Sequence, residues 1–128
     1  MSRGICFVIE DDEDIAGLIS VVLKREGFEV CSVRTASAAL HQLRGLDPVL
    51  ITLDLGLPDL DGLQIAEGLR ELSDAPLLMI TARAPATDQF NGMAAGASAY
   101  LIKPFRPGEL RDAVNRLCPA NSSMQKPE

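Results

Sequence analysis

The residues best suited to chemistry in this chain stand directly after four apolar runs that are typical of β-strands. In chain order they are the acidic residues Glu10, Asp11 and Asp12, then Asp54, Thr81 and Lys103. The carboxyl ends of the strands of an open parallel sheet meet at one edge, so we expect these side chains to gather there. Carboxylates, a hydroxyl and an ammonium together suit a site that holds Mg²⁺ and handles a phosphoryl group.

Asp54 has the most defined setting of the candidates. It is the only carboxylate in the apolar stretch from Val49 to Leu57, so core residues on either side would fix its main chain while its side chain reaches the edge of the sheet. A carboxylate held in this way is suited to attack phosphorus and form an acyl phosphate. Mg²⁺ takes oxygen ligands and keeps several waters, so two or three carboxylates on neighbouring strand ends suit this cation and would need it to offset their repulsion.

The elements that must position these residues alternate along the chain. Strands are predicted at 5–9, 28–33, 49–53, 77–81 and 99–102. Apolar stripes at helical spacing predict helices over 15–23, 36–43, 65–72 and 110–117, with a further helix carrying Phe90, Met93 and Ala94 that closes at Gly96. Because the strands are continuous apolar runs, the sheet should be covered on both faces, which predicts a doubly wound α/β fold with five parallel strands.

Composition limits the classes of protein to consider. A chain of 128 residues with 47% hydrophobic residues has the size of one domain with a proper core, which we expect over 1–118, followed by a flexible tail or truncated linker over 119–128. A net charge of -6 without a Lys/Arg run argues against direct binding of nucleic acid or an anionic membrane by this segment. The absence of a long apolar run or a signal peptide favours a cytoplasmic protein. Three cysteines, two of them in strand-like runs, indicate reduced packing thiols.

Four segments together resemble the receiver domains of two-component response regulators. They are residues 8–12 (VIEDD), 53–62 (LDLGLPDLDG), 80–83 (ITAR) and 96–105 (GASAYLIKPF), and the resemblance covers residues 4–117. It implies a flavodoxin-like sheet with strand order 2-1-3-4-5. It also implies a phosphorylation-dependent switch that catalyses its own phosphorylation and the slow hydrolysis of its phosphate.

The resemblance assigns roles around the metal. Asp54 would be the phospho-acceptor and a ligand of Mg²⁺. Asp11 would hold Mg²⁺ directly, Glu10 would hold it through water, and Gly56 would offer its backbone carbonyl.

The resemblance also assigns the parts of a switch. Thr81 would be the switch hydroxyl, Tyr100 the switch aromatic, and Lys103 the phosphoryl-binding cation, with a cis peptide between Lys103 and Pro104. If Thr81 moves toward the phosphoryl group, Tyr100 can fill the space behind it, and the surface changes.

Partners follow from the same resemblance. The phosphoryl donor would be a sensor histidine kinase or a phosphotransfer protein, docked around Ile15, Leu18, Ile19, Pro104 and Phe105. The sequences of these motifs are similar to those of the receiver subgroup that carries a winged-helix DNA-binding domain and regulates transcription. We expect no such domain within these 128 residues.

The surface expected to carry the output is formed by the helix near 90–94, the strand 99–102 and the helix 110–117. In that subgroup this surface usually makes a dimer through charged pairs. Ser98 and Ala99 stand where acidic residues are common, and Gln89 and Ala113 stand where basic residues are common, so we expect a weak homodimer or a different partner.

Simpler interpretations exist for single residues, and two other functions remain open. Asp12 or Asp14 would favour the positive N-terminus of the first helix, and His41 would be a plain helix-surface residue. One alternative function is a degenerate receiver that acts as a protein-binding module. The other is a Mg²⁺-dependent phosphohydrolase resembling the haloacid-dehalogenase family, which needs a second Asp where this chain has Gly56.

Overall fold

The structure, a computed structural model, describes residues 2–57, 62–82 and 98–119. Its centre is a five-stranded parallel sheet with strand order β2-β1-β3-β4-β5. The strands are β1 (Ile5–Ile9), β2 (Glu29–Val33), β3 (Leu50–Asp54), β4 (Leu77–Thr81) and β5 (Ala99–Ile102). The predicted fold class and the predicted strand order are therefore confirmed.

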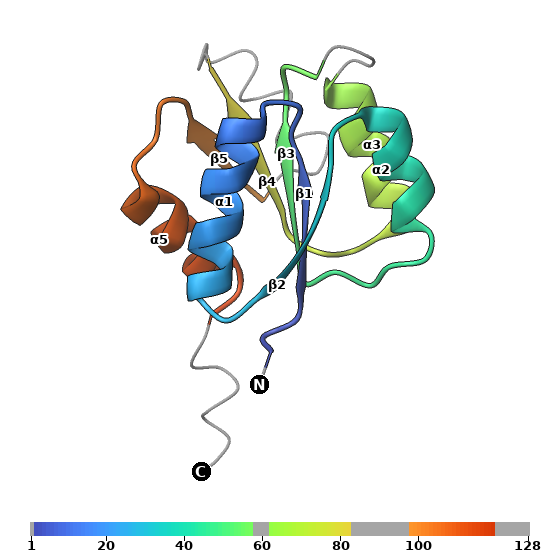
Figure 1. The fold of residues 1–128 in the computed structure, drawn as a ribbon. Helices are drawn as coiled ribbons and strands as arrows, with labels where there is room; N and C mark the ends of the chain where they lie inside the picture. Colours follow the sequence, from blue (N-terminus) through green and yellow to red (C-terminus); the bar gives the residue numbers. More distant parts are fainter. Residues whose placement is uncertain (1, 58–61, 83–97, 120–128) are drawn as a thin grey trace.

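Helices cover both faces of this sheet. Helices α1 (Glu13–Arg25) and α5 (Pro107–Leu117) lie on one face, and α2 (Ala36–Leu43) and α3 (Gly62–Leu72) lie on the other (Figure 1). The helix predicted to carry Phe90, Met93 and Ala94 falls outside the described residues. The remaining four predicted helices are all observed, and the connections between parallel strands give the doubly wound arrangement.

Helix α1 begins and ends where its sequence signals predict. The side chain of Asp12 is the N-cap and accepts hydrogen bonds from the main-chain nitrogens of Asp14 and Ile15, at 2.9 and 3.2 Å. Gly27, just past the C-cap Glu26, has a φ of 98°, a left-handed conformation that glycine adopts without a steric penalty. Asp12 therefore caps the helix that follows the acidic run.

The core has one cluster of apolar side chains on each face of the sheet. In β1, β3 and β4 the apolar residues are almost all fully buried, as the continuous apolar runs predict. The two edge strands are less completely buried, since most residues of β2 are partly or fully exposed and Ile102 in β5 is 45% exposed. An edge strand has a neighbour on one side only, so it is less completely covered than a central strand.

The cysteines and the single histidine lie where the sequence predicts. Cys6, Cys31 and Cys118 are free thiols, and Cys6 is fully buried in the core, as packing cysteines would be. His41 lies exposed on α2, which confirms that it is a surface residue. No helix within the described ranges has the length and apolar character that a membrane crossing requires.

Candidate functional site

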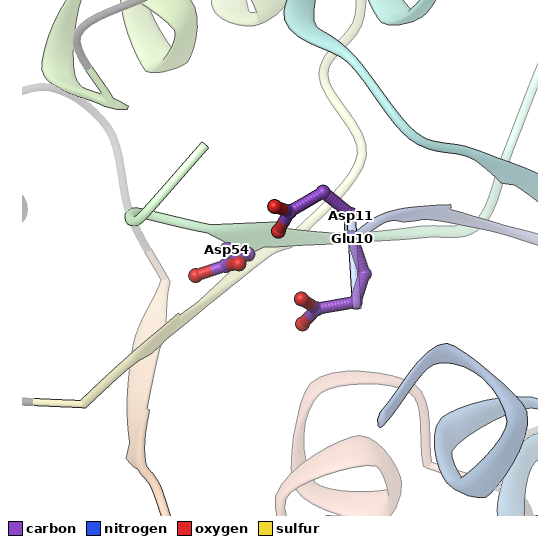
Figure 2. A group of neighbouring side chains, drawn as sticks. All are labelled: Glu10, Asp11 and Asp54. Atoms are coloured by element: carbon purple, nitrogen blue, oxygen red, sulfur yellow. The ribbon is translucent and has the colours of Figure 1, made fainter. Parts of the chain in front are cut away.

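Three carboxylates meet at the carboxyl edge of the sheet. Strands β1 and β3 are neighbours with Ile9 opposite Leu53, so Glu10 and Asp54, the next residues along, come to lie side by side. One oxygen from each of Glu10, Asp11 and Asp54 lies within 4.8 Å of the others. Figure 2 shows Glu10 and Asp11 leaving the end of β1 beside Asp54 at the end of β3. We call these three residues the acidic cluster.

Lys103 reaches the acidic cluster from the end of β5, the edge strand next to β4. Its Nζ lies 3.3 Å from Oε1 of Glu10 and 3.4 Å from Oδ2 of Asp54. The main chain places it there, because Lys103 follows β5 and its backbone nitrogen donates to the carbonyl of Thr81, at 2.7 Å. The Lys103–Pro104 peptide bond is cis, as the resemblance to receiver domains implies. The cluster and Lys103 together carry more negative than positive charge.

Burial makes the electrostatics of the cluster unusual, because Glu10 is only 1% exposed and Asp54 only 5%. Burial, followed by the hydrogen bond and the negative charge of Asp54, raises the pKa of Glu10 to about 7. Burial also opposes ionisation of Asp54. Its hydrogen bonds with the Glu10 carboxyl and the Gly56 amide, together with the charge of Lys103, outweigh this and lower the pKa of Asp54. In the absence of a cation, Glu10 therefore tends to keep a proton that Asp54 shares.

The cluster offers buried oxygen atoms to a cation. Oε1 of Glu10 is buried and accepts no hydrogen bond from any described residue, although it lies 3.3 Å from the Lys103 ammonium. Buried polar atoms normally take part in hydrogen bonds, so a buried carboxylate oxygen that has an ion-pair partner but accepts no hydrogen bond from a described residue fits the needs of a hard cation. The donor set consists of oxygens alone, which suits Mg²⁺ better than a metal that prefers nitrogen or sulfur.

The loop after β3 folds back on Asp54. The backbone nitrogen of Gly56 donates to Oδ1 of Asp54 at 2.8 Å, which orients the carboxylate. A Cβ atom at position 56 would lie 3.3 Å from the same oxygen, a tighter approach than most side chains make. Glycine at this position therefore lets the backbone lie close to Asp54.

Thr81 and Tyr100 lie on neighbouring strands. Thr81 is the last residue of β4, where it pairs with Ile102, and Tyr100 is the second residue of β5, where it pairs with Met79. Tyr100 is partly buried against the core cluster on the α2 and α3 side of the sheet. The structure thus brings Glu10, Asp11, Asp54 and Lys103 together, and it places Thr81 and Tyr100 on the neighbouring strands β4 and β5. Their roles are taken up under the proposal below.

Two surface residues named from the sequence are placed incorrectly. Ile19 is fully buried in the core under α1, so it cannot contact a docking protein, whereas Ile15, Leu18 and Phe105 are partly buried at the margin of that core. Ala113 is also fully buried, so the argument that it replaces a basic residue on an output surface is wrong. Both residues belong to apolar stripes that face the sheet. Gln89 lies outside the described residues.

Arg34 is a charged residue near the cluster that sequence reasoning missed. It follows β2 directly, and its guanidinium binds the Glu13 carboxylate at 2.8 Å and the main-chain carbonyl of Asp11 at 3.3 Å. The rule that singled out the other candidates, a polar residue directly after a strand, would have found it if applied to β2.

Comparison with known proteins gives consistent results. The family model described as response regulator receiver domain matches residues 6–115. The DNA-binding response regulator MtrA of Mycolicibacterium smegmatis is 39% identical over 103 residues, which are 80% of this chain and 45% of that protein. The chain spans less than half the length of this relative.

Solved structures show the same fold. A CheY-like receiver domain protein from Methanospirillum hungatei superposes with a TM-score of 0.85 at 26% identity, covering 94% of this chain and 97% of the other. The BeF3-activated DrrB receiver domain superposes with a TM-score of 0.83 at 26% identity, covering 91% and 97%. With a family match over most of its length and this fold, the chain belongs to the receiver domains of two-component response regulators.

Proposed function

We propose that this receiver domain takes a phosphoryl group on Asp54, with Mg²⁺, from a sensor histidine kinase or a phosphotransfer protein. The observation that carries the proposal is the position of Asp54. It is a buried carboxylate at the end of a central strand, within the acidic cluster and 3.4 Å from the Lys103 ammonium. Family membership supports the class of donor.

The residues that would hold Mg²⁺ are Asp11 and Asp54 through their carboxylates, Glu10 through water, and Gly56 through its carbonyl oxygen. The bound ion would neutralise charge on the phosphoryl oxygens and favour the ionised form of the carboxylates. The close set of carboxylate oxygens supports this assignment, and so does the buried Oε1 of Glu10, which accepts no hydrogen bond from a described residue.

The transfer step requires positioning more than bond chemistry by the protein. An oxygen of Asp54 attacks phosphorus, the new O–P bond forms, and the N–P bond of the phosphohistidine breaks. The electron pair of that bond stays on the imidazole nitrogen of the donor. Lys103, which pairs with Asp54 and Glu10 beforehand, would then pair with the phosphoryl oxygens and balance the added negative charge.

The response of the surface follows from Thr81 and Tyr100. The Thr81 hydroxyl would donate a hydrogen bond to a phosphoryl oxygen, and Tyr100 would turn into the space that this movement leaves. Their neighbouring strand positions and the partial burial of Tyr100 against the core support this proposal. A local charge change would thereby alter the surface at β5 and α5.

The surroundings of the site supply the surface for a donor protein. Ile15, Leu18, Pro104 and Phe105 would contact the kinase or phosphotransfer protein, without Ile19. We assign 1–118 as the receiver unit and 119–128 as a C-terminal tail or truncated linker, and relatives about twice as long are named DNA-binding response regulators. Dimerisation would use the surface that includes β5 and α5, and sedimentation of the phosphorylated protein tests its strength.

The first experiment measures the intact mass of the protein after incubation with acetyl phosphate. We expect the mass of one phosphoryl group to be gained with Mg²⁺ and not with EDTA. Asp54→Asn should gain none, while the control Asp112→Asn, which changes an exposed acid on α5, should behave like wild type. Phosphorylation of Asp54→Asn would identify another acceptor. A folded wild type that neither gains mass nor accepts phosphate from any kinase would support the degenerate binding module instead.

A further inference from the structure

Arg34 connects the end of β2 to the loop that carries the acidic cluster. Its Nη1 lies 2.8 Å from Oε2 of Glu13, and its Nη2 donates to the main-chain oxygen of Asp11 at 3.3 Å. The two segments are already neighbours, because Ile9 pairs with Val33 and the nitrogen of Glu10 donates to the oxygen of Val33 at 3.0 Å. Arg34 therefore approaches the cluster from β2, whereas Lys103 approaches it from β5.

The residues on either side of Asp11 are held in other ways. Glu10 is fixed by its bond to β2, and the nitrogen of Asp12 donates to Oε2 of Glu10 at 3.2 Å. The Asp12 side chain caps α1. The contact from Arg34 reaches the main chain of Asp11 itself, the residue whose carboxylate is one of the three in the cluster.

We infer that Arg34 is a positioning residue that holds the main chain of Asp11, so that its carboxylate is placed for Mg²⁺ before the ion arrives. The consequence for Mg²⁺ rests on the proposed function. Ordering a free loop residue opposes binding, so a loop that is ordered beforehand binds more tightly.

The charge of Arg34 affects Mg²⁺ affinity in the opposite direction from its contact with the Asp11 main chain. A positive charge near the site repels Mg²⁺, so by charge alone its removal would strengthen metal binding. The side chains of Arg34 and Glu13 are 62% and 77% exposed, however, and solvent and salt screen charges at such positions. We therefore expect the positioning effect to exceed the charge effect, and the direction of the change distinguishes them.

The test compares Arg34→Gln and Arg34→Lys with wild type. Mg²⁺ affinity is measured by calorimetry, and backbone ¹⁵N relaxation is measured in the metal-free protein. We expect Arg34→Gln to bind Mg²⁺ about two- to five-fold more weakly. A change of this size matches the loss of one solvent-exposed ion pair or hydrogen bond. Arg34→Lys keeps the charge but cannot form the two-pronged contact, so its affinity should also fall. Arg111→Gln removes an equal charge from an exposed ion pair on α5 and should leave the affinity unchanged.

Relaxation separates this inference from the proposed function. In metal-free Arg34→Gln the order parameters of the Asp11 and Asp12 amides should fall, and those of the α5 amides should not. Unchanged order parameters, or Mg²⁺ binding as tight as that of wild type or tighter, would overturn the inference. If wild type binds no Mg²⁺ while the order parameters fall as expected, the metal site of the proposed function fails and the positioning of Asp11 by Arg34 stands.

Discussion

The ammonium group of Lys103 lies 3.4 Å from Oδ2 of Asp54, and both side chains are largely withdrawn from solvent. One positive charge thus faces a group of carboxylates in which Glu10 is buried as deeply as Asp54. Removing carboxylates from water is costly unless their charge is compensated. A proton on Glu10 supplies part of that compensation when no cation is bound.

The first prediction concerns pH. The pKa of Glu10 is raised from 4.5 to about 7 in the folded protein, so between these values the folded state retains a proton that the unfolded state releases. The stability that depends on this proton is therefore present below pH 4.5 and is lost as the pH rises to 7, by at most about 3 kcal/mol. Urea unfolding in EDTA between pH 5 and 8 should show this decline in wild type.

Glu10→Gln is the control for that prediction, because glutamine has no proton to release. Its stability should change less than that of wild type over the same range. The lowered pKa of Asp54 acts below about pH 4 and does not affect this window. Parallel stability curves for the two proteins would show that Glu10 titrates normally.

The second prediction concerns Lys103→Gln. The charge of Lys103 lowers the pKa of both Glu10 and Asp54, so its loss should destabilise the metal-free protein at pH 8 by about 2 kcal/mol. At pH 5.5 the loss should be smaller, because Glu10 is then mostly protonated. Urea unfolding at both pH values checks this, with Lys24→Gln, an exposed lysine of α1, as the control. An equal loss at both values would mean that Lys103 contributes packing and not charge.

The site could be predicted from the sequence because its residues lie at, or directly after, the carboxyl ends of the predicted strands. In a parallel sheet the order of strands brings Glu10, Asp54 and Lys103 to one edge, although they are far apart in sequence. The contacts of Arg34 could not be read in the same way, since they depend on the path of a long exposed side chain.

The two incorrect surface assignments have a simple physical origin. Ile19 and Ala113 lie within apolar stripes at helical spacing, and such a stripe faces the sheet. Periodicity alone already placed them in the core, and only the family resemblance suggested a surface role. The exposure of the edge strands was harder to predict, because a run of apolar residues in the sequence does not distinguish a central strand from an edge strand.

The third prediction concerns Thr52 in the middle of β3. The residue is 1% exposed, and its Oγ1 has no hydrogen-bond partner among the described residues. Valine has nearly the same shape without the hydroxyl, so Thr52→Val should stabilise the protein by about 1 kcal/mol. Thr52→Ser keeps the hydroxyl and loses a buried methyl group, so it should destabilise by about 1 kcal/mol. Urea unfolding of both variants at one pH checks this, and a destabilised Thr52→Val would indicate that a buried water satisfies the hydroxyl.

The last prediction concerns Arg3, which joins the two ends of the described chain at the pole opposite the acidic cluster. Its guanidinium carbon lies 4.2 Å from the centre of the Phe28 ring. It donates to the main-chain oxygens of Glu26 and Cys118, at 2.7 and 2.6 Å, and to Oδ1 of Asn115, at 3.1 Å. The Asn115 amide in turn donates to the Glu26 carboxylate at 3.0 Å. A single partly buried side chain thus ties β1, the turn after α1 and the last turn of α5 together.

Arg3→Ala should therefore destabilise the protein by about 2 kcal/mol, since it leaves partly buried carbonyl oxygens without donors and uncovers the ring of Phe28. Arg3→Lys should recover less than half of this loss, because an ammonium cannot supply the planar fork that reaches Glu26 and Cys118 together. Hydrogen exchange of the Cys118 amide, which donates to Val114 at 2.8 Å, should accelerate in both variants before global unfolding. Arg25→Ala, at an exposed position near the end of α1, is the control. If Arg3→Ala leaves both the stability and the exchange of Cys118 unchanged, the end of α5 is held by its apolar contacts alone.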